Sequence, residues 1–178
     1  MKTSVLGAVL AAIALCTSVH AATPVALMTP VSFDPSTDKR EEVKTECKLG
    51  EMIETHVGNA LRRANKGPGT TTSMDGSVLK VTVTTIWGAR GNNWTGPKGL
   101  LIRADLFQDG KLDRSIDLHR TTLGGIMGPF MGICGFMERD VKTLADDVQL
   151  WLRDPKLAPE QTPAPPREPA ASASDAAK

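Results

Sequence analysis

The sequence predicts an α+β fold, a two-layer sandwich in which a mainly antiparallel four-stranded sheet carries two helices on one face, in the order β-α-β-β-β-α. Three observations predict this layout. Four segments alternate apolar and polar residues, as half-buried strands do. Two segments repeat their apolar residues at the helical period. One helical segment follows the first strand and the other follows the fourth, so both can cover the sheet.

The first strand and the first helix are expected between residues 25 and 65. Residues 25–33 alternate as a strand, and Pro30, which cannot donate a ladder hydrogen bond, predicts an edge position. The charged run DKREEVKTE follows, and Thr45 is the expected N-cap of the helix. The run NKGPG at 65–69 ends that helix. The apolar face of the helix comprises Val43, Cys47, Val57, Leu61 and Ala64.

Three further strands are expected between residues 77 and 118. The apolar face of the first comprises Leu79, Val81, Val83 and Trp87. The apolar sets of the other two are Leu100, Ile102, Ala104 and Leu106, and then Leu112, Ile116 and Leu118. The turn between these two strands is predicted as a three-residue loop, 108–110, with Gly110 left-handed. That loop pairs Leu106 with Leu112, whereas a two-residue loop would set apolar rows against polar ones.

The stretch RTTLGGIMGPFMGICGFMERD, residues 120–140, is interpreted as the entrance to the second helix. Pro129 suits the first turn of this helix, and Gly132 and Gly135 are expected to allow close packing. The helical stripe that supports this interpretation comprises Phe130, Cys134, Met137, Val141, Leu144, Val148 and Trp151.

Cys47 and Cys134 are the cysteines that remain after residues 1–21. In an exported protein two cysteines most simply form one disulfide, and two buried thiols are the alternative. A right-handed crossover and antiparallel hairpins would place the starts of the two helices side by side. Because one cysteine lies near each start, the disulfide also fits the predicted topology.

Residues 1–21 have the pattern of a secretory signal peptide: an early lysine, a short apolar run and small residues before a cleavage site near Ala21. The apolar run is too short to span a membrane. Residues 22–154 are expected to form a single α+β domain, and the Pro/Ala-rich residues 155–178 a disordered tail. The expected location is therefore periplasmic or secreted.

Charge and motifs exclude several classes of function. Without residues 1–21 the chain keeps 20 basic and 20 acidic side chains, which gives no electrostatic attraction to nucleic acid or to an anionic membrane. No cofactor is expected, because LGGIMGPF lacks the Gly-Lys-Ser/Thr ending of a phosphate-binding loop. No Ser-His-Asp or Cys-His arrangement is recognisable, so an enzyme is not expected.

Two places are candidate binding sites. Asp117 and His119 lie two residues apart on one strand and share its polar face, so with a third ligand they would bind a divalent metal or a small molecule. Trp94 lies near Arg90 in the Gly/Asn-rich loop ARGNNWTGPKG. Exposed aromatic side chains in long loops anchor interfaces, so these two residues are a candidate contact with a partner.

The order of elements over Val25–Leu152, with CKLGEMIETHVGNAL and GGIMGPFMGICGFM before WLRDP, resembles small exported accessory proteins of Gram-negative bacteria, such as the TolB amino-terminal domain and YajG-like lipoproteins. The lipoprotein signal of the latter is not found in this sequence. The resemblance implies a non-enzymatic periplasmic or secreted protein that binds or positions another envelope component, either a protein or part of the cell wall. The alternative is a periplasmic protein that binds a small ligand or metal on the Asp117/His119 face.

Overall fold

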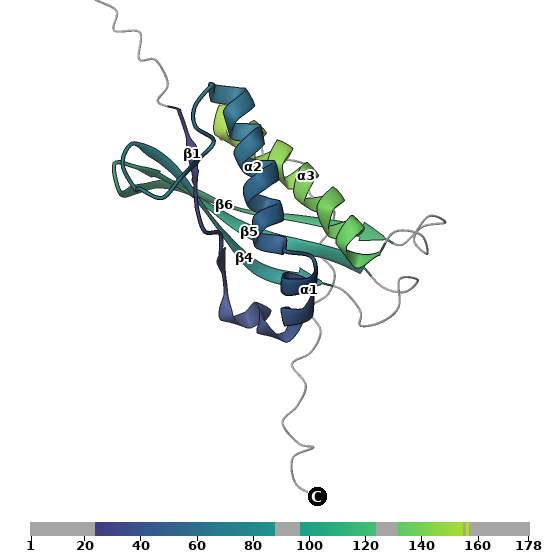
Figure 1. Ribbon diagram of the computed structural model, residues 1–178. Coiled ribbons are helices and arrows are strands. Elements are labelled where there is room, and N and C mark those ends of the chain that lie inside the picture. Colours follow the sequence, from purple (N-terminus) through teal and green to yellow (C-terminus); the bar gives the residue numbers. More distant parts are fainter. Residues whose placement is uncertain (1–23, 88–96, 124–131, 155, 157–178) are drawn as a thin grey trace, which may run out of the picture.

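The computed structural model describes residues 24–87, 97–123, 132–154 and 156, and its fold is α+β, as predicted (Figure 1). A six-stranded mixed sheet carries two long helices, α2 and α3, on one face. The strands are β1 (Ala26–Met28), β2 (Ser32–Phe33), β3 (Thr70–Thr71), β4 (Ser77–Trp87), β5 (Pro97–Gln108) and β6 (Lys111–Leu123). The helices are η1 (Pro35–Arg40), α1 (Glu41–Glu46), α2 (Leu49–Asn65) and α3 (Ile133–Arg153).

The sheet has the order β3-β1-β4-β5-β6, and β2 also pairs with β4. β1 and β2 run parallel to β4, β3 runs parallel to β1, and β4, β5 and β6 are antiparallel. The predicted first strand is thus two short strands, and β3 is an additional one. The edge position predicted from Pro30 holds for β2, which pairs only with β4 among the described strands, but not for β1, which lies between β3 and β4. Pro30 lies between β1 and β2, where its missing N–H interrupts neither strand.

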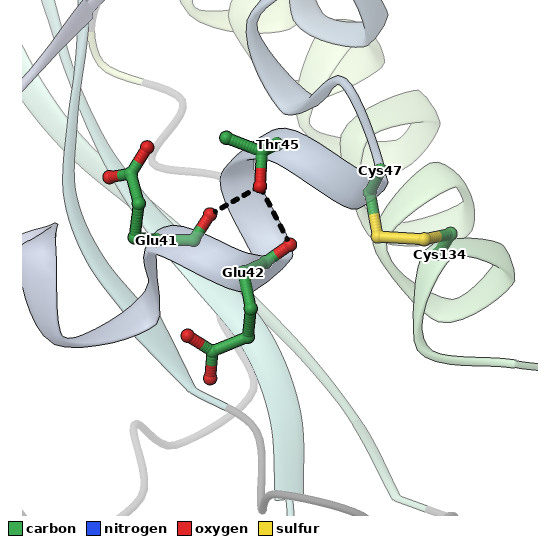
Figure 2. Close-up of a disulfide and its surroundings, with 5 residues drawn as sticks. All are labelled: Glu41, Glu42, Thr45, Cys47 and Cys134. Carbon is green, nitrogen blue, oxygen red and sulfur yellow. Dashed lines mark hydrogen bonds between the residues drawn. A yellow bond between two sulfur atoms is a disulfide. The ribbon is translucent and has the colours of Figure 1, made fainter.

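The first predicted helix is divided at Lys48, whose backbone is left-handed at φ 48° and ψ 49°. The shorter segment before it is α1 and the longer one after it is α2. Thr45 is therefore not the N-cap of the long helix. It lies inside α1, where its hydroxyl donates to the backbone carbonyls of Glu41 and Glu42 (Figure 2).

The hydrophobic core lies between the sheet and the two long helices. α2 ends at Asn65, within the predicted NKGPG stop, and Lys66 caps it in a left-handed conformation. Ala64 is exposed, contrary to the prediction, and Ala60 is buried instead. Val57 and Leu61 are buried as predicted, so the difference is confined to the last turn, where Ala64 lies one residue before α2 ends. The largest fully buried side chains include Leu27, Ile53, Leu61, Leu79, Ile102, Leu118, Met137 and Leu144.

A disulfide joins the approach to α2 with the start of α3, so the predicted pairing is confirmed (Figure 2). Cys47 lies just before α2 and Cys134 lies in the first turn of α3, with their Cα atoms 5.0 Å apart. The starts of the two helices are therefore neighbours, as the topology requires. The bond closes a sequence separation of 87 residues.

The entrance to α3 differs in detail from the prediction. α3 begins at Ile133, and Gly132 is its N-cap rather than a residue of its interior. Gly132 is not closely packed, because a Cβ atom there would meet nothing within 4 Å. The expectations for Pro129 and Phe130 fall outside the described residues.

A β-bulge in β4 decides which face of the sheet its last residues occupy. The pairing of β4 with β5 shifts between Val83 and Thr85, so Thr84 is the extra residue. Alternation then resumes out of phase, which places Ile86 on the core side and Trp87 on the opposite side. The prediction that Trp87 shares the apolar face of β4 is wrong for this reason.

The turn between β5 and β6 has two residues, Asp109 and Gly110, with φ angles of 48° and 76°. The predicted three-residue loop and its pairing of Leu106 with Leu112 are therefore wrong. A register shift at Asp113 compensates for the shorter turn. Beyond this shift, apolar residues of the two strands lie opposite each other, as Ile102 and Leu118 do. Leu112 is left 56% exposed near the turn.

Candidate functional site

The side of β4, β5 and β6 turned away from α2 and α3 is here called the open face (Figure 1). Strand pairing arranges its side chains in rows that cross the three strands. These rows are Lys80, Asp105 and Ser115; Thr82, Arg103 and Asp117; Thr85, Leu101 and His119; and Trp87, Gly99 and Thr121.

Three side chains at one end of the open face, Trp87, Leu101 and His119, form what we call the aromatic patch. The indole of Trp87 meets the imidazole of His119 edge-on, with ring centroids 6.5 Å apart and an angle of 76° between the rings. All three side chains are half-buried. Gly99 lies opposite Trp87 and places no side chain between it and Thr121. The patch therefore offers apolar and aromatic surface beside hydrogen-bonding groups.

Charged and polar side chains continue the open face beyond the aromatic patch. Asp105 accepts hydrogen bonds from Arg103 Nε at 3.1 Å and from Ser115 Oγ at 2.5 Å. Asp117 lies opposite Arg103 in the strand pairing. Exposed pairs of this kind contribute little to stability. Apolar surface bordered by such polar groups is the usual anatomy of a protein interface.

Asp117 and His119 both lie on the open face, as the alternation of β6 predicted. Their neighbours on β5 are Arg103 and Leu101 respectively. Within the described residues, no cluster of three or more His, Cys, Asp or Glu side chains is placed to hold a metal ion. Metal binding by Asp117 and His119 therefore stays a prediction.

Trp94 and Arg90, the other predicted contact, lie outside the described residues. Trp87 was missed as a functional residue because an uninterrupted strand would place it in the core. The sequence does contain a signal for its true position. Val83 and Ile86 are three residues apart, and a strand can bury both only if one extra residue lies between them.

The helix-covered side of the sheet carries a buried polar cluster that joins α3 to β6. Arg120 donates to both carboxylate oxygens of Asp147, at 2.7 and 2.6 Å. Thr122 donates to Asp140 Oδ1 at 2.5 Å, while Asp140 Oδ2 is buried with no hydrogen-bond partner among the described residues. Asp140 is only 4% exposed, and burial raises its pKa to about 6. The cluster orients α3 on the sheet.

Lys98 adds a buried cation at the same end of the sheet. Its side chain is fully buried, and its ammonium nitrogen lies 5.3 Å from the ring centroid of Phe136 on α3. An ammonium over an aromatic ring gains electrostatic attraction, and more so when it is desolvated. Lys98 and Phe136 thus hold β5 against the start of α3, as Arg120 and Asp147 hold β6.

A groove of about 420 Å³ runs between α2 and residues 68–70. Two of its polar side chains already have partners inside the domain. Glu54 accepts a hydrogen bond from the backbone of Val31 at 2.9 Å, and Arg62 donates to Asn59. Part of the lining of this groove thus serves the fold itself, and we take the open face as the candidate binding surface.

No family model matches the chain. No curated protein matches it either. The solved structures to which the chain is slightly similar include a variant PelC dodecamer from Paraburkholderia phytofirmans, with a TM-score of 0.46, 15% identity, and coverage of 70% of this chain and 87% of that one. A putative lipoprotein from Caulobacter crescentus CB15 gives a TM-score of 0.41, 11% identity, and coverage of 74% and 92%. A minor lipoprotein from Acinetobacter baumannii gives a TM-score of 0.41 and 14% identity, and the match covers 78% of this chain and 96% of that one.

These similarities are too slight to assign a family or a function, so the function is argued from the open face itself. None of the helices in the described ranges has the length and apolar character needed to cross a membrane.

Proposed function

We propose that this chain is an exported, non-enzymatic accessory protein that binds a protein of the cell envelope through the open face of its sheet. The observation that carries the proposal is the position of Trp87. The bulge at Thr84 turns this large aromatic side chain out of the core and onto the open face, next to His119. Tryptophan is enriched among the residues that contribute most to protein interfaces.

The surroundings of Trp87 favour a protein partner over a small ligand. The aromatic patch lies on the sheet outside the two grooves at α2 and α3 that the described residues form, and small ligands bind mainly in clefts that enclose them. The charged pair of Arg103 and Asp105 and the side chain of Asp117 lie on the same face, and both signs of charge are present. A partner with a flat surface and mixed polar groups would match this pattern.

The proposal also explains why two clamps hold the helices on the other side of the sheet. The disulfide between Cys47 and Cys134 joins the starts of α2 and α3. The ion pair between Arg120 and Asp147 fixes α3 on β6. A sheet supported in this way presents its open face in one conformation, which lowers the entropic cost of binding.

A photo-crosslinking amino acid at Leu101 tests the proposal in cells that export the chain. We expect an adduct with another envelope protein, identified by mass spectrometry, which disappears when Trp87→Ala is added. The matched control places the crosslinker at Arg63, which is exposed on α2. Equal adducts from Leu101 and Arg63, or no adduct from Leu101, would refute a binding role of the open face.

A further inference from the structure

The outer edge of β6 has no partner strand in the described part of the chain. β6 is the last strand in the sheet order, and β5 pairs with it on the other side. Monomeric proteins usually protect a long edge strand with a proline, a bulge, charged side chains or a covering segment. Between Ser115 and Thr122 the strand contains no proline, glycine or bulge, its register shift lies before this segment at Asp113, and its charged side chains, Asp117 and Arg120, are of opposite sign.

We propose that this edge pairs with the same edge of a second copy of the chain, antiparallel and around a twofold axis at Leu118. The two sheets would then form one continuous sheet, a common way to satisfy the backbone groups of an edge strand. A twofold axis makes the interface self-complementary, so each contact occurs twice. The proposal concerns the edge of the sheet and goes beyond the binding role of the open face.

The charges along β6 select the position of the axis. With the axis at Leu118, Asp117 of each copy lies opposite His119 of the other, and Ser115 lies opposite Thr121. An axis at Asp117 would place two carboxylates opposite each other, and an axis at His119 would place two imidazoles opposite each other. A carboxylate opposite an imidazole can accept a hydrogen bond across neighbouring strands, whereas two carboxylates directly opposite each other destabilise a sheet. Leu118 is therefore the favoured centre.

The position of α3 is compatible with this pairing. α3 contacts both outer strands, since Asp147 is bonded to Arg120 of β6 and Phe136 packs on Lys98 of β5. Strands are spaced about 4.8 Å apart, so a helix centred between β5 and β6 would lie roughly 10 Å from its symmetry copy. That is close to the distance of about 8 to 10 Å at which two helices pack. The helices of the two copies would thus touch without overlapping.

Leu150 provides an independent indication of the same interface. It is 40% exposed, and it and Leu112 are the exposed large apolar side chains of the described residues. Leu150 lies three residues after Asp147, which faces β6, so it is on the same side of α3 but turned farther outward. In the proposed dimer Leu150 would be buried against the α3 helix of the second copy.

The oligomeric state of the mature chain tests this proposal by analytical ultracentrifugation over a wide range of concentrations. We expect a dimer that dissociates on dilution, with Leu150→Asp raising the dissociation constant by about tenfold or more. Leu112→Asp is the matched control, because Leu112 is also exposed but lies by the hairpin turn. A chain that stays monomeric at every concentration would overturn the proposal, and so would equal effects of the two substitutions.

A charge exchange tests the position of the axis. Asp117→Lys alone should weaken the dimer, because it sets a lysine opposite His119 of the second copy. Adding His119→Asp should restore the dimer, because the lysine at 117 of each copy then faces an aspartate at 119 of the other. Failure of the double variant to recover would rule out an axis at Leu118. Melting curves confirm that each variant is folded, and Leu150→Ser replaces Leu150→Asp if the latter does not fold.

Discussion

Arg120 and Asp147 form a two-point ion pair that ties the last strand to the last helix, with N···O distances of 2.7 and 2.6 Å. Both side chains are largely buried. Arg120 lies opposite the fully buried Leu100, in a row that is otherwise apolar. A charge in this position must have a partner, because an uncompensated buried ion is costly. Asp147 supplies that partner.

Removing the carboxylate of Asp147 should therefore destabilise the domain strongly. Asp147→Ala is expected to lower the free energy of unfolding by about 3 kcal/mol, because it leaves the guanidinium of Arg120 buried and unpaired. Asp146→Ala is the control, since Asp146 is exposed on the same helix and should change stability by less than about 0.5 kcal/mol. Urea denaturation measures both. Similar losses for the two variants would contradict a role for the ion pair.

Removing the carboxylate of Asp140 should instead stabilise the domain, because the pKa of this group is raised from 3.8 to about 6, mainly by burial. Between these pH values the folded protein binds more protons than the unfolded chain, so this group's contribution to stability falls as pH rises. Above pH 7 the carboxyl group is fully ionised in the folded protein, and its burial then lowers the free energy of unfolding by up to roughly 3 kcal/mol. Asp140→Asn should therefore raise the free energy of unfolding at pH 8 by about 1 to 2 kcal/mol.

The advantage of Asp140→Asn should shrink as pH falls from 7 toward 4, because wild-type Asp140 then becomes neutral as well. Thermal melts of the wild type and the variant at a series of pH values measure the difference directly. Taking the difference removes the contributions of other carboxylates, which both proteins share. An advantage that stays constant over this pH range would mean that the carboxyl group titrates normally.

The disulfide should contribute a large part of the stability. For the 87-residue separation, the chain-entropy estimate is about 4 to 5 kcal/mol, a third or more of a typical domain's stability. Replacing both Cys47 and Cys134 by alanine should lower the melting temperature by about 10 °C or more. Peptide mapping without reductant checks the bond itself. Free thiols in protein isolated from the exporting cells would contradict the pairing.

Gly99 should not tolerate a side chain. A Cβ atom there would overlap the backbone carbonyl oxygen of Arg120 and approach Thr121 Cα to 2.8 Å. Gly99→Ala should therefore disturb the pairing of β5 with β6 and cost about 2 kcal/mol. Gly50→Ala is the control, because its Cβ would meet only the ring of Phe33 at 3.5 Å, an ordinary contact. Similar stability of the two variants would show that the strands can separate without cost.

The parts of the fold that follow one unbroken period could be predicted from the sequence. The core-facing residues of β5, such as Ile102 and Ala104, alternate without interruption and are buried as predicted. The stripe of Val141, Leu144 and Val148 on α3 keeps the helical period and is also buried. The disulfide followed from the number of cysteines and from helix direction together. In each case two independent features led to the same structure.

The errors occur where one residue breaks a period. The extra residue at Thr84 reverses the alternation, and Trp87 changes face as a result. At the hairpin the Asp109-Gly110 pair is the usual composition of a two-residue turn, but it conflicts with the apolar rows unless a bulge follows. Asp113 is that bulge. At Lys48 a non-glycine residue adopts a left-handed conformation, which local sequence preference disfavours.

The candidate site was only partly predictable for the same reason. Asp117 and His119 were placed correctly on the open face, because β6 alternates regularly through them. Trp87 was assigned to the core, so the aromatic patch could not be assembled from the sequence. The pairing of Arg120 with Asp147 depends on side chains 27 residues apart. No local pattern predicts such a contact, since it depends on how α3 lies across the sheet.

The binding role of the open face is tested most directly by the affinity of the protein captured from the Leu101 position. Its dissociation constant should be measured for wild type, Trp87→Ala and Arg63→Ala, each with a melting curve to confirm folding. We expect Trp87→Ala to weaken binding by about tenfold or more, as for a central aromatic residue of an interface, and Arg63→Ala, on the exposed side of α2, to bind like the wild type. Unchanged affinity of folded Trp87→Ala would contradict the assignment of the open face as the binding surface.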